Sequence, residues 1–546
     1  MTENKKLKQL VVNCEKLETR VALLTDGKLE QYEIEREEDR TEAMSGSVYL
    51  GKVSNLEPSL QAAFVDIGAE KNAFLHYWDM QPTKYDAADN IKAEAAAEAE
   101  TKKNSLTDKI RGVLTKKKGC EIKKLEQRRR SKKVSDKDIP KLFPKSTKLL
   151  VQVSKGPIGT KGARVTTNLS IPGRYLVMLP YSNHIGLSKK IEDKVERKRL
   201  KKILSELEVP EGMGLICRTV GEGRKSAYFD RDLEMLLDIW REVEVHLENP
   251  KAPKVVYQEP TLLQRTVRDF LTEDIDEIIV DDADAFKLLQ GQLNKLVGRK
   301  TARKVTEYKQ HQPLFEAYGI KKLVEKIYER EAHLPSGGYI CIDETEALIA
   351  IDINSGKSRK GKNQAETTLT TNLEACNEIA RQLKVRNIGG LVVIDFIDMK
   401  SAKDREKVVR HMRSLVKEDR AKSKILPISK LGLMEMTRQR EHQSLQDTVF
   451  DPCPYCAGRG HVKSAYSMSV EIQRRLQHIL RLSHRKSGLA VRIIMHPTIL
   501  NRLKTEDVKL LDEFEEKYGK DLTFRADESI HMEEFKFVDS ETGKEL

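Results

Sequence analysis

Two glycines, an apolar run and two acids follow one another in Gly389-Gly390-Leu391-Val392-Val393-Ile394-Asp395-Phe396-Ile397-Asp398. An uninterrupted apolar run after a glycine turn is typical of a strand buried inside an α/β sheet. Upstream of it, apolar residues recur at the spacing of one helix face, at Leu369, Leu373, Cys376, Ala380 and Leu383. We therefore expect a helix that ends near Asn387 and leads directly into a strand.

Further elements of the same kind flank this pair. Residues 339–342 and 347–351 are apolar runs separated by Asp343-Glu344-Thr345-Glu346, which predicts a hairpin. Beyond the strand, a second helix is predicted from the apolar face formed by Val408, Val409, Met412, Leu415 and Val416. Strand, helix, strand and helix in this order predict an α/β layer whose strands are neighbours.

Both predicted strands end in acid, at Asp352 and Asp395, and Asn354 lies two residues after the first. If the strands are neighbours, the two carboxylates lie at one end of the sheet, where open α/β sheets keep their sites. Carboxylates held close need a cation or a proton between them. Oxygen ligands with open positions suit Mg²⁺ or Mn²⁺, which can activate water against a phosphodiester. Ordinary strand-end caps are the competing interpretation.

A second motif beside these acids is misleading. Gly356-Lys357-Ser358 follows the first strand and imitates the end of a phosphate-binding loop. That motif requires a glycine five positions before Gly356, where this chain has Ile351. Nucleotide hydrolysis by such a loop is therefore rejected.

The composition limits the class of protein. The 546 residues carry 98 Lys plus Arg and 85 Asp plus Glu, a net charge of +13, with 39% hydrophobic and 34% charged residues. This balance excludes a membrane protein and a disordered chain, and the length predicts about three to five domains. No run approaches the ~20 apolar residues of a bilayer helix. The N-terminus lacks a signal-peptide core, and seven scattered cysteines make a poor disulfide framework, so we expect a cytoplasmic protein.

The positive charge is concentrated in one segment. Residues 91–145 hold 18 Lys or Arg and 8 Asp or Glu, a net of +10. A polybasic insert attracts nucleic acid without reading its sequence. A charged loop that only keeps the chain soluble explains the same composition.

Short strands flank this insert. Residues 48–53, 62–66, 73–75, 148–153 and 164–167 have strand patterns with glycine-marked bends, which suggests a small barrel interrupted by the insert. Phe64 and Phe74 are possible stacking platforms for bases, as on an oligonucleotide-binding barrel. Packing in the core is the other interpretation of these two rings.

The clearest local motif is Asp451-Pro452-Cys453-Pro454-Tyr455-Cys456-Ala457-Gly458-Arg459-Gly460-His461. Cys-x-x-Cys followed by glycines predicts a zinc knuckle. Two thiolates are half of a tetrahedral site, so either His461 and another residue complete it or a second copy of the chain does. A redox dithiol is the alternative, but it should lie between a strand and a helix N-terminus, whereas this pair precedes two glycines.

Together these residues resemble the ribonuclease E/G family of bacterial endoribonucleases. The resemblance covers nearly the whole chain except residues 91–145. The most specific stretches are residues 57–66, 350–355, 371–375 and 389–399, and the Cys-Pro-x-Cys-x-Gly-x-Gly loop that begins at Cys453. The motifs also follow the family's order.

The resemblance implies a role for each matching position. Asp352 and Asp395 match Mg²⁺-binding aspartates, with Mn²⁺ as a substitute, and Asn354 matches the amide that supports them. Cys453 and Cys456 match cysteines that share one Zn²⁺ between two subunits, in a homo-oligomer that is a dimer or a tetramer built as a dimer of dimers.

Further matches concern RNA. Phe64, Phe74 and Lys161 match the RNA-contacting surface of the barrel. The positions that match a pocket for a 5′-monophosphate are Gly173, Val177, Arg218 and Thr219. The implied activity is Mg²⁺-dependent endonucleolytic cleavage of A/U-rich single-stranded RNA in ribosomal RNA processing and messenger decay, leaving 5′-phosphate and 3′-hydroxyl ends.

The resemblance also implies a multidomain α/β architecture with a β-barrel. The expected order is an RNase H-like part (1–42), an OB-fold RNA-binding barrel with its basic insert (43–167), a 5′-sensor region (168–263), a second RNase H-like part (264–327), a DNase I-like α/β catalytic domain (328–449), a zinc link (450–463) and a small α/β domain (464–546).

Two features depart from the family pattern. The insert is longer and more basic than usual, and Lys189-Lys190 stand where the family often has arginines, whose bidentate fork lysine lacks. No long tail follows residue 546, so we expect neither a scaffold for partner enzymes nor a membrane helix, and an architecture closest to ribonuclease G.

Two other functions remain to be separated from the nuclease. A non-catalytic RNA-binding assembly factor would keep the barrel and the zinc link, but Asp352, Asn354 and Asp395 are all intact. A dithiol oxidoreductase would reduce disulfides without RNA, and its zinc content would distinguish it.

Overall fold

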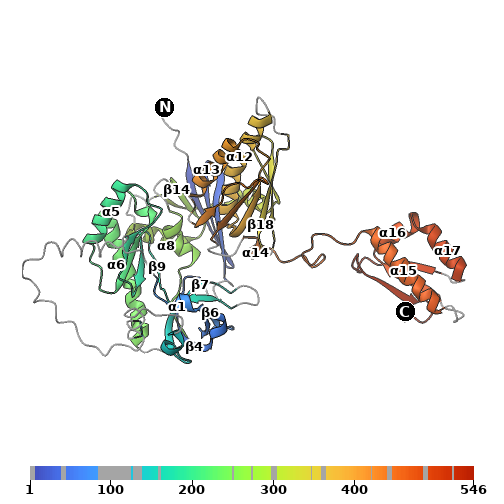
Figure 1. The fold of residues 1–546 in the computed structure, drawn as a ribbon, viewed down its shortest axis with the longest axis horizontal. Coiled ribbons are helices and arrows are strands. Elements are labelled where there is room, and N and C mark those ends of the chain that lie inside the picture. Colours follow the sequence, from blue (N-terminus) through green and yellow to red (C-terminus); the bar gives the residue numbers. More distant parts are fainter. Residues whose placement is uncertain are drawn as a thin grey trace, which may run out of the picture. The chain divides into compact units, whose positions relative to one another are not determined.

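The fold was analysed on a computed structural model. It describes residues 7–37, 45–83, 125–126, 138–157, 162–248, 251–271, 275–296, 304–345, 347–357, 364–417, 419, 421–439, 445–483, 490–518 and 522–546. Most of the basic insert, and Lys161, lie outside these residues. The chain forms two compact units, Met1–Thr448 and Val449–Leu546 (Figure 1). Within the described residues, no helix has the length and hydropathy that a bilayer crossing requires.

The strand that follows Gly389 belongs to a six-stranded sheet of order β16-β17-β18-β19-β21-β20. The predicted hairpin and the predicted neighbouring strands are confirmed, because β17 pairs antiparallel with β18, and β18 pairs parallel with β19. The strands are β16 (Glu331–His333), β17 (Tyr339–Glu344), β18 (Ile349–Asn354), β19 (Gly390–Asp395), β20 (Ser423–Ile425) and β21 (Leu433–Arg438).

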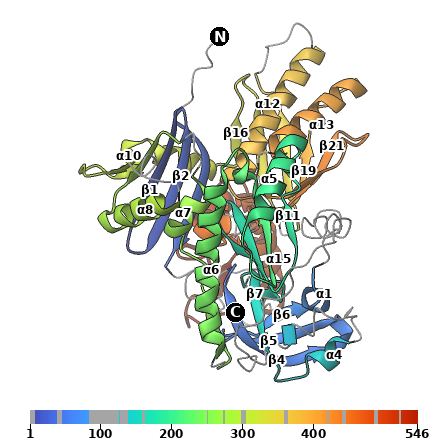
Figure 2. The ribbon, with the colours of Figure 1, turned by 90° about the vertical axis from the view of Figure 1, so that its left-hand side faces the viewer.

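Helices α12 (Gln364–Val385) and α13 (Ala402–Lys417) lie side by side over one face of this sheet (Figure 2). Alternate strand residues, including Ile351 and Ile394, pack against them. The other alternate strand residues lie on the opposite face of the sheet, where Leu391 is 40% exposed. The prediction that 391–394 is buried on both sides is therefore wrong, because among the described residues α12 and α13 cover one face and leave the Leu391 side chain exposed on the other.

A second sheet joins distant parts of the chain, in the order β15-β14-β1-β2-β3. Strand β1 pairs in parallel with β14, so the N-terminal residues and residues near 280 share one sheet. Arg381 of α12 donates a hydrogen bond to the carbonyl of Leu29 (3.2 Å), which ties this sheet to the first. The elements are β1 (Lys8–Cys14), β2 (Glu18–Thr25), β3 (Lys28–Arg36), β14 (Glu277–Val280), β15 (Val305–Glu307), α7 (Leu262–Asp269), α8 (Ala283–Leu296), α10 (Leu314–Ala317) and α11 (Ile320–Ile327).

The strands on either side of the basic insert close into a barrel of five. Its order is β4-β5-β6-β8-β7, with β7 pairing back to β4, and β13 adds to the outside of β4. This is the closed barrel that the strand patterns suggested, and its geometry is consistent with an OB-fold. The elements are β4 (Val48–Glu57), β5 (Ala62–Asp66), β6 (Ala73–His76), α1 (Tyr77–Met80), α4 (Ile139–Leu142), β7 (Lys148–Lys155), β8 (Arg164–Thr166) and β13 (Lys254–Tyr257).

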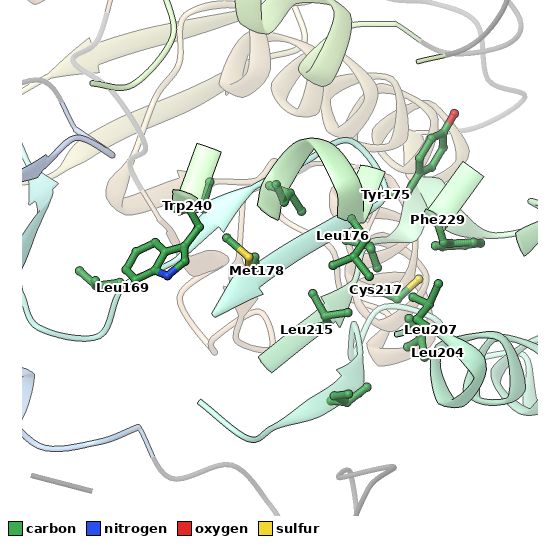
Figure 3. Close-up of a cluster of buried hydrophobic side chains, with 14 of the residues drawn as sticks. Leu169, Tyr175, Leu176, Met178, Leu204, Leu207, Leu215, Cys217, Phe229 and Trp240 are labelled. Carbon is green, nitrogen blue, oxygen red and sulfur yellow. The ribbon is translucent and has the colours of Figure 1, made fainter. Parts of the chain in front are cut away.

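A four-stranded sheet of order β11-β12-β10-β9 follows the barrel. Figure 3 shows its core, where Tyr175 and Phe229 pack near Cys217, and Trp240 packs beside Leu169 and Met178. The elements are β9 (Ile171–Pro172), β10 (Leu176–Pro180), β11 (Ile185–Leu187), β12 (Met213–Cys217), α5 (Lys194–Glu206) and α6 (Ser226–Glu248).

The second unit has its own small core. Strand β22 pairs parallel with β23 and antiparallel with β24, and the helices of the unit pack on this sheet around buried residues such as Ile472 and Ile493. Helix α14 (Leu445–Val449) lies in the first unit except for its last residue. The elements of the second unit are α15 (Ala465–Ser483), β22 (Val491–Met495), α16 (Pro497–Thr505), α17 (Val508–Tyr518), β23 (Leu522–Ala526) and β24 (Phe535–Asp539).

Candidate active site and RNA-facing surfaces

The two strand-end acids lie together. Asp352 of β18 and Asp395 of β19 are register partners in the parallel pair, so their side chains leave the same face of the sheet. Both are exposed on the face opposite α12 and α13. Asn354 lies on the same face, and its amide donates a hydrogen bond to the Asp352 carboxylate (2.8 Å). The structure therefore brings together all three side chains that the sequence placed at this edge.

The charge state of Asp395 reflects its neighbours. Its pKa is raised, first because the surrounding protein removes part of its hydration, and then by the negative charges of Asp352 and Asp398. A cation placed among these carboxylates would relieve the repulsion. Repulsion of this kind among neighbouring carboxylates is typical of a site that can bind a cation.

A buried amide from another element holds the loop after β19. Asn372 of α12 is fully buried, and it donates to the carbonyl of Ile397 (2.9 Å) and accepts from its N–H (3.2 Å). Ile397 lies between Asp395 and Asp398, so this contact fixes the acidic loop. Asn372 lies in residues 371–375, one of the stretches that resemble the family, but the sequence predicted no role for it. A polar residue on the apolar side of a predicted helix was the available signal.

The donor set fits a hard divalent cation in an open site. Among the described residues, no three His, Cys, Asp or Glu side chains gather as a closed metal cage. Mg²⁺ does not need such a cage, because it keeps several waters and binds through one or two carboxylates together with substrate phosphates. The Asp352 and Asp395 pair, with Asn354 orienting the first, meets that requirement.

The barrel presents aromatic rings on its outer side. Phe64 and Phe74 are cross-strand partners on β5 and β6, and their ring centroids lie 6.0 Å apart in an edge contact. Neither belongs to the barrel core, where Ala63, Val65 and Leu75 are buried. The core interpretation of these rings is therefore wrong. Lys161, predicted to join this surface, lies outside the described residues.

The residues predicted to sense a 5′-phosphate also gather at one place. Arg218 donates to the carbonyl of Gly173 (2.6 Å), and Thr219 follows Arg218 on the surface. Val177 pairs with Pro172, the neighbour of Gly173. Arg218 also lies 3.6 Å from Asp269. A guanidinium in this position can donate hydrogen bonds to a phosphate at this edge.

A buried carboxylate shapes the backbone beside Gly173. Asp232 accepts hydrogen bonds from the N–H groups of Arg174 (3.0 Å), Tyr175 (2.8 Å) and Leu176 (2.8 Å). A Cβ added to Gly173 would lie 2.6 Å from an Asp232 oxygen. Glycine is therefore required here by close packing against this carboxylate.

The two motif cysteines lie in a turn of the second unit. Cys456 accepts the Gly460 N–H (3.3 Å), and this bond, with one from Cys453, lowers the pKa of its thiol. No third His, Cys, Asp or Glu gathers with the pair among the described residues. The pair also precedes α15 by several residues and does not occupy a helix N-terminus, which disfavours the redox interpretation.

Comparisons with known proteins agree over most of the chain. The family model described as "Ribonuclease E/G family" matches residues 170–441, and one described as "RNase E/G, Thioredoxin-like domain" matches residues 452–540. The chain is 35% identical to ribonuclease G of Salmonella typhimurium (strain SL1344), over 97% of this chain and 99% of that protein. Ribonuclease G of Haemophilus influenzae is 34% identical over 97% of this chain and 99% of that protein. Ribonuclease E of Escherichia coli (strain K12) is 37% identical over 86% of this chain and 40% of that protein.

Proposed function

Because this chain belongs to the ribonuclease E/G family, we propose that it is an endoribonuclease that cleaves single-stranded RNA at the Asp352 and Asp395 edge of its six-stranded sheet. The observation that carries the proposal is the direct register pairing of these two acids in β18 and β19. An ordinary pair of strand-end caps would not need the adjoining loop to be fixed by a buried amide, as Asn372 fixes it here.

Each residue of the edge has a proposed task. Asp352 and Asp395 hold Mg²⁺, or Mn²⁺ in its place, and Asn354 orients the Asp352 carboxylate. When bound, the cation supplies Lewis-acid stabilisation of the phosphodiester and lowers the pKa of a nearby water. Among the described residues, α12 and α13 cover the opposite face of this sheet, which leaves the acidic face for an extended strand. The expected products carry 5′-phosphate and 3′-hydroxyl ends, and A/U-rich segments are the expected targets because they remain single-stranded.

The other surfaces guide the RNA to this edge. Phe64 and Phe74 stack bases on the barrel, together with the charge of Lys161. The 5′-monophosphate docks at Arg218 and Thr219, against the backbone of Gly173 and Val177. We assign these roles because the two rings are half-buried outside the barrel core and the guanidinium reaches the Gly173 carbonyl.

We further propose the domain arrangement that the resemblance implies. Residues 1–42 and 264–327 form an RNase H-like domain, 43–167 the OB-fold barrel, 168–263 the 5′ sensor, 328–449 a DNase I-like catalytic domain, 450–463 the zinc link and 464–546 the small domain. Cys453 and Cys456 supply half of a zinc site, and the same pair from a second copy supplies the other half.

The test measures cleavage and binding of a short A/U-rich RNA that carries either a 5′-monophosphate or a 5′-hydroxyl. We expect internal cuts with Mg²⁺, none with EDTA, and loss of about 10³-fold or more in rate for Asp352→Asn. The matched control is Asp343→Asn, because Asp343 lies on the neighbouring strand β17 and forms an exposed ion pair with Arg330 (2.6 Å). Its rate should match the wild type.

The 5′ end is tested in the same assay. Thr219→Val should reduce the preference for the monophosphate while leaving cleavage of the 5′-hydroxyl RNA unchanged. Tight RNA binding without cleavage under every condition would overturn the nuclease proposal in favour of a non-catalytic RNA-binding factor. If Asp352→Asn keeps full activity, the protein is a nuclease, but the assignment of its active site to Asp352 and Asp395 is wrong.

A further inference from the structure

The aromatic surface of the barrel continues past Phe74. His76 follows on the same strand face, with its ring centroid 6.4 Å from that of Phe74. Trp78 comes next, and its centroid lies 4.4 Å from His76 at an interplanar angle of 35°. Phe64, Phe74, His76 and Trp78 thus form one continuous row, which we call the ring row. Its residues lie on β5, β6 and α1, three elements that are labelled in Figure 2.

The four rings differ in exposure. Phe64, Phe74 and His76 are half-buried, and Trp78 is exposed. His76 is the cross-strand partner of Ala62, which is fully buried. The Nδ1 atom of His76 accepts the Trp78 N–H (3.3 Å), which fixes the chain as it turns into α1. In this arrangement Nδ1 is an acceptor, so in the neutral ring the proton lies on Nε2, which can donate to a ligand.

The exposure of Trp78 is the least expected feature. Its side chain is 64% exposed, whereas the other tryptophan of the chain, Trp240, is 2% exposed and packs edge-on against Tyr181. A large exposed aromatic ring next to three others indicates a surface that binds a ligand. A tryptophan offers both a stacking face and an N–H donor.

The flanks of the ring row indicate the chemistry of the partner. Arg164 on β8 is the register partner of Phe74, and Lys155 on β7 is that of Arg164, so the row has a basic side. Asp79 pairs with Arg164 (2.9 Å) and holds its guanidinium in place. On the opposite side, β4 presents Glu57 across from Ala62. Flat rings with cations along one side suit a single nucleic-acid strand, with bases on the rings and phosphates along β8 and β7.

We infer that His76 and Trp78 are RNA-binding residues that extend the stacking surface of Phe64 and Phe74, so that the barrel holds additional bases of the substrate strand. The inference rests on the proposed function, because it takes single-stranded RNA as the ligand. It goes further in assigning a specificity-determining surface: affinity should rise with RNA length until the strand reaches Trp78. The basic insert adds charge that attracts the strand but contributes no residue to this assignment.

The experiment uses the full chain in EDTA, so that binding is measured without cleavage, and a series of A/U-rich oligoribonucleotides of increasing length. Trp78 is itself the reporter, because the buried Trp240 should respond little. We expect the longer RNAs to quench tryptophan fluorescence in the wild type, and the quenching to disappear in Trp78→Phe.

Affinity provides the second measurement. Trp78→Ala should weaken binding of long RNAs by about 5- to 100-fold, the range found for loss of one stacked base, and should leave the shortest RNAs unaffected. His76→Ala should act in the same direction. Trp78→Phe keeps a ring and should retain most of the affinity. The matched control is Tyr466→Ala, which removes a similarly exposed ring (61%) from α15 in the other unit and should change nothing.

The outcomes separate this inference from the proposed function. If the wild type binds RNA and Phe64→Ala weakens it, but Trp78→Ala binds like the wild type at every length, only the inference is overturned. Unchanged RNA affinity with a lower oligomeric mass would instead assign Trp78 to a contact between copies. If the wild type binds no RNA, or Phe64→Ala has no effect, the proposed RNA surface itself is wrong.

Discussion

A single buried amide determines the shape of the acidic loop. Asn372 uses both ends of its side chain on the backbone of Ile397, between Asp395 and Asp398. Asn372→Ala would leave both backbone groups without that partner, at a cost of about 1–3 kcal/mol, and would allow the acids to shift. We expect a 10- to 100-fold drop in cleavage rate, roughly what a misplacement of about 1 Å costs, with little change in the affinity for RNA in EDTA.

The control for this variant lies on the same helix. Asn377 is exposed on α12 and its side chain contacts His411 (3.0 Å), so Asn377→Ala should cut RNA at the wild-type rate. An Asn372→Ala protein that loses RNA affinity and rate in equal measure would show a general structural defect and contradict the positioning role.

Among individual residues, the acids were predictable and Asn372 was not. Asp352, Asn354 and Asp395 follow apolar runs, so the strand ends alone place them on one edge. The role of Asn372 depends on a contact with a loop 25 residues further along the chain. That contact exists only after α12 packs on the sheet, so the sequence pattern marks Asn372 as a buried polar residue but does not indicate its partner.

At the scale of elements, helix α5 stabilises the turn that follows the proposed 5′-phosphate-sensing residues. Glu196 pairs with Arg199 (2.6 Å) and accepts the Gly223 N–H (2.8 Å), four residues after Thr219. The hydrogen bond from Arg199 is the main reason that the pKa of Glu196 falls from 4.5 to about 2. Because the folded pKa is depressed, the stabilisation is complete above about pH 4.5 and is lost as pH falls from there towards 2.

Hydrogen exchange of the segment around Gly223 measures this effect. At neutral pH, Glu196→Gln should exchange about 2- to 5-fold faster than the wild type, since a half-exposed ion pair contributes little. The difference between the two proteins should shrink as pH falls below about 4.5. Glu206→Gln, at the other end of α5, is the control. A difference that stays constant down to pH 3 would refute the linkage.

Elements were predictable where periodicity is local. The helix before Gly389 and the hairpin at 339–351 were correct because apolar spacing decides them. The prediction that Leu391 is buried was wrong, and the prediction for Phe64 left two alternatives open. The sequence pattern of an apolar strand residue does not distinguish a side chain that faces the core from one on a surface used for binding. Deciding this requires knowing which face the helices cover.

At the scale of the whole molecule, contacts within its own unit hold the cysteine loop in place. Tyr455 packs against His531 (4.2 Å between centroids), and Arg459 pairs with Glu533 (2.7 Å), so the loop is fixed to the small domain of its own unit. The lowered pKa of Cys456 favours the thiolate that zinc requires. A preformed half-site of this kind should bind metal fully only when a second copy supplies the other two thiolates.

This arrangement predicts a metal content of one Zn²⁺ for two chains, measured by elemental analysis, and an oligomer whose mass is measured by light scattering. Cys453→Ser should lose the metal and lower the oligomeric mass, since two tetrahedral positions are lost in each site. Cys14→Ser, which changes a cysteine of β1, should keep both. One Zn²⁺ for each chain, with the mass unchanged in Cys453→Ser, would show that the remaining ligands come from the same chain. The knuckle would then stabilise its own domain, and the contact between copies would have to lie elsewhere.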